Sequence, residues 1–413
     1  MHSKQKDQWA KRGNSNHVLF TFFLACLWIL GLSTCVCAFS WDPEPPIPNY
    51  DPPRWEKVRT LWANHYGGDN IDELIATLTP LKEAYPANIE PILLLARAHY
   101  LHARYKSKDR KEHFEKSEKY ALQACKMDPK NLYALAMLVE ALCYSRDREY
   151  IFSNYGTMIR SYAPIASAEA LPDMKYSGWD AFKVLWAARV DVEKGKSAVA
   201  MVEKMAKENP ADGLAQIWAS RANYYVGEYY TSTNEHDAKA LVYYDKGMSY
   251  ASKARKLLPH SVPANYWYQL NRSRSVQFTS LLNKARYLMD ILKPLYVCSE
   301  ENNFYYFGGP MLTLATMVTN GGWITEKGMH LVNITLDMAK NGLEIAEILL
   351  PNYYYIPYAR ADILAYKGKK AEAEVILEKL IIRDPNVDPL VPENYIFIRL
   401  AKRLYNDIKQ GKY

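Results

Sequence analysis

The sequence predicts an all-α protein in which pairs of helices repeat about every 34 residues. From residue 55 onward, apolar residues recur three and four positions apart, which is the spacing of an amphipathic helix, and no convincing strand alternation appears. Prolines follow the expected helices at intervals, and Pro351 and Pro385 are 34 residues apart. With 413 residues, 49% of them hydrophobic, and only six cysteines, the core must form by packing rather than by disulfides.

Residues 1–38 are predicted to form an export signal. Four basic residues and one acidic residue precede an apolar run from Val18 to Trp28, and the small residue Ala38 before Phe39 fits a cleavage site. Two alternatives remain open. Cys35 follows a degenerate lipobox and could carry a lipid, or the apolar stretch, which is long enough to span a bilayer, could stay as an uncleaved anchor. All three readings export the rest of the chain from the cytoplasm, and in each of them the chain would contact a membrane only through this segment.

A proline-rich linker is expected at residues 39–54. Six prolines fall between Trp41 and Pro53, a composition that favours an extended spacer over a helix. The alternative is an ordered arm that packs on the first helix pair. The folded helical domain is expected over residues 55–405, and residues 406–413 are expected to form a C-terminal tail.

The repeat is typical of tetratricopeptide proteins, in which two antiparallel helices form one unit and small residues let the helices approach closely. The last unit shows this best, with Ala361 and Ala373 at small positions and an inter-helix turn at residues 367–369. Longer units are explained by insertions around 105–111 and 229–241, and a lengthened helix is expected over 324–350. Segments 145–178 and 276–303 are helical but off the pattern, so we expect an irregular superhelix. The prolines that end helices are Pro86, Pro129, Pro210, Pro259, Pro351 and Pro385.

The first helix of each unit is expected to line a concave groove. When each terminal proline is set at repeat position 32, positions 2, 5, 9, 12 and 13 of the next first helix face inward. Arginines and tyrosines recur at these positions, and they could hold an acidic group against guanidinium groups and an apolar body against rings. Solvated arginines and core tyrosines are the alternative. The candidate groove residues are Arg97, Tyr100, Arg221, Tyr224, Tyr225, Tyr266, Arg274, Tyr355 and Tyr358.

Motifs for catalysis, cofactors and metals give no positive signal. The sequence has no phosphate-binding glycine loop, no GxSxG and no nucleophile beside a plausible base, so neither an enzyme nor a cofactor is predicted. His99 and His102 have the i, i+3 spacing of a metal-binding pair, but no third ligand adjoins them in sequence, and a packed or surface pair is favoured. Cys125 and Cys143 lie on neighbouring helices and could pair or remain free thiols. The net charge of +7 is spread along the chain, which does not indicate nucleic-acid binding.

From about residue 239 to the end, the chain resembles the tetratricopeptide accessory T component of tripartite ATP-independent periplasmic (TRAP) transporters. The motifs that carry this resemblance are Tyr243-Tyr-Asp-Lys-Gly247, Ala264-Asn-Tyr-Trp-Tyr268, Phe307-Gly-Gly-Pro310, Gly321-Gly322, Leu350-Pro351-Asn-Tyr353 and the unit from Ala361 to Leu380. The resemblance implies an all-helical periplasmic protein, often lipid-anchored, that self-associates and engages a solute-binding protein. The degenerate lipobox and the high tyrosine content depart from the family, so no functional residue is carried over.

We therefore expect a non-enzymatic accessory to solute uptake whose groove binds a solute-binding protein or a small acidic or amphipathic solute. The first alternative is a general envelope scaffold that grips peptide segments of other proteins. An enzyme with an unrecognised site is a second alternative.

Overall fold

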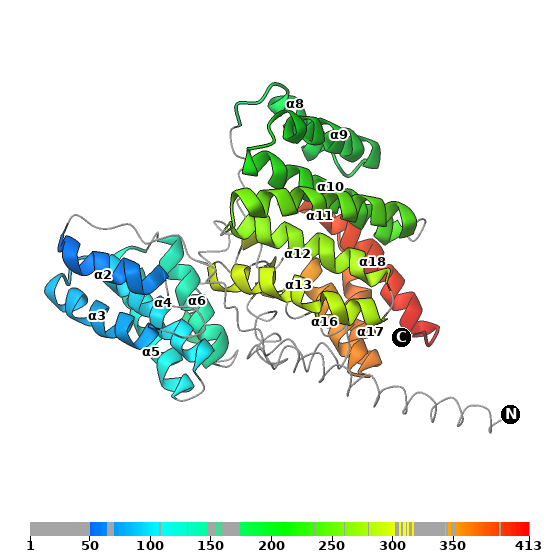
Figure 1. Ribbon diagram of the computed structural model, residues 1–413. Coiled ribbons are helices and arrows are strands. Elements are labelled where there is room, and N and C mark those ends of the chain that lie inside the picture. The colour runs from blue at the N-terminus through cyan, green and yellow to red at the C-terminus, as the bar shows by residue number, and fades with distance from the viewer. Residues whose placement is uncertain are drawn as a thin grey trace. The chain divides into compact units, whose positions relative to one another are not determined.

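The computed structural model describes residues 50–412 with gaps, of which the longest are 158–173 and 318–342. It confirms the all-α prediction, because the described residues contain helices and no strand (Figure 1). The first helices are α2 (Pro52–Ala63), α3 (Ile71–Ala84), α4 (Glu90–Tyr105), α5 (Arg110–Met127) and α6 (Leu132–Ser145). The later ones are α8 (Trp179–Ala187), α9 (Val192–Glu208), α10 (Gly213–Thr233), α11 (Asp237–Leu257), α12 (Val262–Gln277), α13 (Leu281–Glu301), α16 (Tyr355–Tyr366), α17 (Lys370–Ile381) and α18 (Val391–Lys409).

Four helices end two residues before a predicted terminal proline. Helices α3, α5, α9 and α11 stop at Ala84, Met127, Glu208 and Leu257, followed by Pro86, Pro129, Pro210 and Pro259. Proline disfavours helical geometry at the residue before it and lacks the N–H that would continue the ladder, so it sets these boundaries. The turn expected at residues 367–369 also forms between α16 and α17, with Gly368 at a φ of 78° that favours glycine.

Small residues occur where neighbouring helices approach closely. Ala361 and Ala373, on α16 and α17, are fully buried. A Cβ atom added at Gly227 of α10 would lie 2.6 Å from the ring of Tyr244 on α11, so the absent side chain is what allows this contact. The insertion predicted around 229–241 mainly lengthens helices, since α10 and α11 each have 21 residues whereas α16 and α17 each have 12.

The last helix returns to the middle of the chain. Helix α18 packs against α10 as well as α16 and α17, and α10 in turn packs against α9, α11 and α12 (Figure 1). The strongly amphipathic sequence of α18 explains this, because its apolar positions recur on one face and are buried, among them Ile396, Leu400 and Leu404. This return brings the N-terminal end of α18 beside α10.

Two domain boundaries differ from the sequence-based expectation. Helix α2 begins at Pro52, inside the predicted linker, because proline suits the first turn of a helix. Tyr50 before it is packed, with its hydroxyl donating to Glu90 Oε2 at 3.2 Å and its ring 4.5 Å from that of Tyr85. This end of the segment therefore agrees with an ordered arm. Helix α18 extends through Lys409 and so includes residues assigned to the tail.

Several predictions lie outside the described residues. These are the export signal with Cys35, most of the proline-rich segment, most of 145–178, and most of the long helix expected at 324–350. Within the part of the chain that the structure describes, no helix combines the length and apolarity needed to cross a membrane.

Candidate functional site

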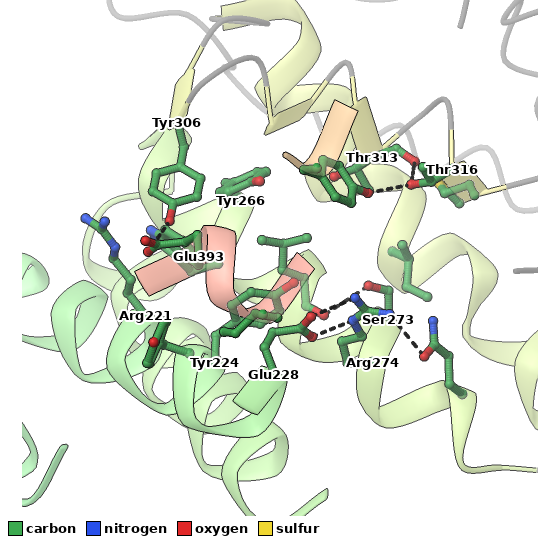
Figure 2. A pocket seen from close by; sticks show the side chains of 18 of the residues that line it. Arg221, Tyr224, Glu228, Tyr266, Ser273, Arg274, Tyr306, Thr313, Thr316 and Glu393 are labelled. Carbon is green, nitrogen blue, oxygen red and sulfur yellow. Dashed lines mark hydrogen bonds and ion pairs between the residues drawn. The ribbon is translucent and has the colours of Figure 1, made fainter. Parts of the chain in front are cut away.

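An aromatic pocket of about 160 Å³ lies among helices α8, α10, α12, α13, α16 and α18 (Figure 2). Its size is comparable to a cavity of about 150 Å³ that admits benzene. The lining includes nine aromatic side chains and four charged ones. The aromatic residues are Trp186, Tyr224, Tyr225, Tyr266, Trp267, Tyr306, Tyr353, Tyr355 and Phe397, and the charged residues are Arg221, Glu228, Arg274 and Glu393.

Helical spacing places these side chains on shared faces. On α10, Tyr224, Tyr225 and Glu228 lie three, four and seven positions after Arg221, so the four residues share one side of the helix. On α12, the pocket-lining residues run from Tyr266 to Gln277 with the same kind of spacing. Two walls of the pocket are therefore faces of α10 and α12.

An ion pair joins α10 and α12 at one side of the pocket (Figure 2). Arg274 donates from Nε to Glu228 Oε1 at 2.6 Å and from Nη2 to Glu228 Oε2 at 2.8 Å, the bidentate geometry that arginine forms with carboxylates. Tyr244 also donates to Glu228 Oε1 at 2.7 Å. Both oxygens of Glu228 thus have donors, and the guanidinium of Arg274 is already engaged by a protein carboxylate.

A second carboxylate, Glu393, lies in the first turn of α18 and is 6% exposed. Its Oε1 accepts from Arg189 Nη2 at 2.6 Å and from the Tyr306 hydroxyl at 3.2 Å. Burial raises the pKa of Glu393, but Arg189 and, more weakly, Arg221 outweigh this effect, so the pKa stays below its usual range and the group is ionised at neutral pH. Among the described residues, no donor reaches Glu393 Oε2.

A further charged side chain of the lining, Arg221, is surrounded by aromatic rings. Its guanidinium carbon is 4.6 Å from the ring centroid of Trp218, 4.8 Å from Tyr306 and 5.3 Å from both Trp186 and Trp267. These distances are within the range of cation–π attraction. The rings hold a positive charge inside an apolar wall, with only 4% of the residue exposed.

Tyr306 has a left-handed backbone, with a φ of 47°. This geometry costs a bulky residue about 1–3 kcal/mol, and such residues concentrate at functional sites. Its contacts offset the cost, because the ring packs 4.8 Å from Trp267 and the hydroxyl binds Glu393. The strained residue is therefore the one that contacts both Arg221 and Glu393.

Four tyrosines of the pocket are neutral. Burial raises the pKa of Tyr224, Tyr225, Tyr266 and Tyr353 above the ordinary value, with nearby glutamates or tyrosines adding to the effect. Their hydroxyls act as hydrogen-bonding groups rather than phenolates. One such contact links Thr316 Oγ1 and the Tyr355 hydroxyl at 3.0 Å.

Six of the nine residues predicted for the groove line this pocket: Arg221, Tyr224, Tyr225, Tyr266, Arg274 and Tyr355. Tyr358 lies just behind, with its ring 6.5 Å from that of Phe397. Arg97 and Tyr100 do not line it. They are buried in α4, where Tyr100 packs on Phe114 of α5.

Sequence reasoning missed several pocket residues. Glu228 carries a recognisable signal, because it continues the spacing of Arg221 and Tyr224 on the same helix face. Glu393 and Phe397 belong to α18 and Tyr306 to a segment outside the repeats, so the repeat positions could not identify them.

A third histidine, His113, lies against the predicted pair His99 and His102. The insertion brings His113 against both predicted residues, with its Nδ1 3.0 Å from that of His99 and its ring stacked 3.5 Å from the ring of His102. Burial lowers the pKa of His99 to about 3, and the pKa values of His102 and His113 are lowered for the same first reason. No group among the described residues could hold a metal ion. The pair is a packed cluster, as favoured above.

The possible disulfide does not form at Cys125, which is a free and buried thiol whose pKa burial raises to about 11. Comparisons with known proteins add no identity: no protein-family model matches the chain, and no curated protein matches it.

Proposed function

We propose that the chain is a non-enzymatic binding protein whose aromatic pocket holds a small, acidic and amphipathic organic molecule. The observation that carries this proposal is the placement of the Arg221 guanidinium within a ring-lined pocket of about 160 Å³. Pockets for small molecules are mainly apolar with a few placed polar groups, and this one has that composition. The rings suit an apolar body, and the arginine suits a carboxylate.

We place the acidic group at Arg221, whose guanidinium is surrounded by the rings of the pocket, and assign Arg274 to the wall. The guanidinium of Arg274 is engaged in a bidentate pair with Glu228 at 2.6 and 2.8 Å, which leaves it little capacity for a ligand carboxylate. Arg274 and Glu228 instead shape the wall by joining α10 to α12. The sequence predicted three groove arginines, Arg97, Arg221 and Arg274. We propose that Arg221 alone contacts the acidic group of the ligand.

The wider role that we propose is accessory binding in solute uptake outside the cytoplasm, in a tetratricopeptide-like array that engages a solute-binding protein. Support comes from the TRAP T-component resemblance of residues 239–413, and from helix ends at prolines and small residues at close helix contacts. Genes for a permease and a solute-binding protein beside the gene of this chain would favour the transport role. Their absence, with capture of extended peptides by the purified chain, would favour the envelope scaffold.

Calorimetric titration tests the binding proposal. Purified protein would be titrated with the probes 3-phenylpropanoate, benzoate and hexanoate, and with 3-phenylpropanamide as a neutral analogue. We expect a carboxylate to bind, and Arg221→Ala to weaken it by about 30-fold or more, because truncating one side of a desolvated charge pair costs about 2–5 kcal/mol. Arg383→Ala removes an exposed guanidinium outside the pocket and serves as the matched control.

Thermal melts of each variant would separate loss of folding from loss of binding. Absence of binding by every carboxylate, or equal binding by wild type and a folded Arg221→Ala protein, would refute the proposal. Tryptophan fluorescence gives a second readout, since Trp186 and Trp267 line the pocket.

A further inference from the structure

A row of exposed lysines runs along α11. Lys239, Lys246 and Lys253 follow one another at intervals of seven residues, so they lie on one side of the helix, and all three are exposed. Seven residues of α-helix rise about 10.5 Å, which sets the interval between the charges. The carboxylate of Asp245 on the same helix lies toward α12, where it accepts from the Ser275 hydroxyl at 2.7 Å. The row therefore gives one side of α11 a regular series of positive charges.

Each lysine of the row lies over a tyrosine ring. The distances from Nζ to the ring centroid are 5.6 Å for Lys239 and Tyr230, 5.9 Å for Lys246 and Tyr243, and 5.4 Å for Lys253 and Tyr250. These distances are within the range of cation–π attraction, which limits the freedom of each side chain. The entropy lost when a partner fixes these lysines is therefore reduced.

Helix α9 continues the positive surface beside this row. Lys196 Nζ of α9 lies 5.9 Å from the centroid of the same Tyr230 ring that Lys239 contacts. Glu203 Oε1 of α9 lies 3.7 Å from Lys246 Nζ. In both cases the α11 residue follows the α9 residue by 43 positions, so the two helices lie side by side and run in the same direction. Helix α10, which supplies Tyr230, packs against both (Figure 1). We call the lysine face the surface formed by Lys196, Lys239, Lys246 and Lys253.

The lysine face carries more positive charge than its neighbouring carboxylates compensate. Lys196 and Lys246 each have a glutamate nearby, at 2.6 and 3.7 Å. Among the residues that the structure describes, no carboxylate pairs with Lys239 or Lys253. Two exposed ammonium groups at opposite ends of the row are therefore available to an acidic partner.

The lysine face suits an acidic protein helix. A membrane-bound helix inserts a broad apolar face, whereas Val242 is the one exposed large hydrophobic residue between Lys239 and Lys253, a stretch that the structure describes throughout. The rings of Tyr230 and Tyr250 are 8% and 7% exposed, so they cannot stack on nucleic-acid bases. A second copy of the face would bring ammonium groups together. An α-helix with carboxylates seven residues apart has the same interval as the row and the opposite charge.

We propose that the lysine face binds an acidic α-helix of a partner protein, whose carboxylates repeat every seven residues and pair with Lys239, Lys246 and Lys253. The spacing of the three charges and the two uncompensated ammonium groups carry this inference. It does not depend on the pocket ligand, since none of these lysines lines the pocket. The lysine face and the pocket are thus two separate sites, which separate experiments test.

A designed peptide is the probe for the lysine face. It is fluorescently labelled, helical and rich in alanine and glutamine, and it carries three glutamates seven residues apart. The control peptide has the same composition with the glutamates five residues apart, which distributes them around the helix. Fluorescence anisotropy at low salt should show about 5-fold tighter binding of the first peptide, because the second can align fewer ion pairs. Added salt should weaken the binding, since exposed ion pairs are screened.

The double variant Lys239→Gln/Lys253→Gln removes the two uncompensated charges. It should weaken binding of the first peptide about 10-fold, which is within the range for two exposed ion pairs. Lys379→Gln/Lys402→Gln removes two exposed lysines from α17 and α18. This matched control changes the net charge equally and should bind the peptide as the wild-type protein does. A thermal melt checks the fold of each variant, and if the first does not fold, the two peptides on the wild-type protein decide the question.

Equal binding of the two peptides, or no binding of either, would overturn the proposal. Equal binding of the first peptide by the wild-type protein and a folded Lys239→Gln/Lys253→Gln protein would also overturn it. Sedimentation with vesicles of phosphatidylcholine and phosphatidylglycerol is the remaining comparison. Vesicle binding that needs Lys239 and Lys253, without peptide binding, would assign the face to a membrane surface instead. Each of these outcomes leaves the proposed function standing, because the pocket ligands are titrated separately.

Discussion

Replacing either Arg274 or Glu228 alone should destabilise the protein, whereas replacing both with apolar residues should leave its free energy of unfolding nearly unchanged. Glu228 is 4% exposed, and the Arg274 side chain is 19% exposed, so the pair is largely shielded from water. Replacing Arg274 with Met leaves the Glu228 carboxylate buried, with the Tyr244 hydroxyl as its remaining donor among the residues that the structure describes. Breaking a buried pair costs about 3–5 kcal/mol, and the partial exposure of Arg274 places the expected loss near the lower end.

The double variant should recover most of that stability. Replacing a buried ion pair with apolar residues of similar volume is often nearly neutral, because the desolvation cost of both charges disappears. We therefore expect Arg274→Met and Glu228→Leu each to lower the free energy of unfolding by about 3 kcal/mol. The combination should lie within about 1 kcal/mol of the wild-type protein. Tyr244 keeps a partner in Thr231 Oγ1 at 2.8 Å, so its hydroxyl is not orphaned in the double variant.

Urea denaturation of the four proteins, followed by circular dichroism, measures this cycle. An unchanged dependence of the unfolding free energy on urea would show that the variants share one unfolding transition. Strictly additive losses, with the double variant about 6 kcal/mol less stable, would refute the description of a self-compensating pair. A loss below about 1 kcal/mol for Arg274→Met would show that the pair is solvated in solution.

Three further predictions concern helix contacts and pH. Gly227→Ala should lower the melting temperature despite the better helix propensity of alanine, because its Cβ would lie 2.6 Å from the Tyr244 ring; a higher melting temperature would contradict the close contact. Ala373→Leu should cost about 1–3 kcal/mol by overpacking the fully buried contact between α16 and α17, and an unchanged thermal melt would contradict it. Acid should destabilise the fold, because below pH 6.5 the unfolded chain protonates His99, whose pKa is about 3 when folded, and the lowered pKa values of His102 and His113 act in the same direction; urea titrations should show a loss between pH 8 and pH 5, of which His99→Gln removes about 2 kcal/mol.

The sequence predicts the parts of this fold that depend on local chemistry. Proline positions predict where α3, α5, α9 and α11 end, because the restriction acts on the residues immediately before the proline. Ala361 and Ala373 were identified as close-contact positions for a similar reason, since only small side chains leave room there. The boundaries at residues 52 and 409 were less accurate, because α2 begins with a proline inside the expected linker and α18 continues its buried face to Ile408.

The same distinction holds in the candidate site: the sequence predicts residues that helix spacing places there, but not residues that distant helices bring there. Repeat counting identifies helix faces, so it placed Arg221, Tyr224 and Tyr225 together on α10, but it assigns Arg97 and Tyr100 the same positions on α4, where they are buried among other helices. What faces a given helix depends on which distant element packs there. Glu393 reaches the pocket only because α18 returns to α10, across more than 160 residues of sequence, and no local pattern encodes that return. Glu393 is therefore a pocket residue that the repeat could not predict, whereas the α10 face of the pocket is one that it did predict.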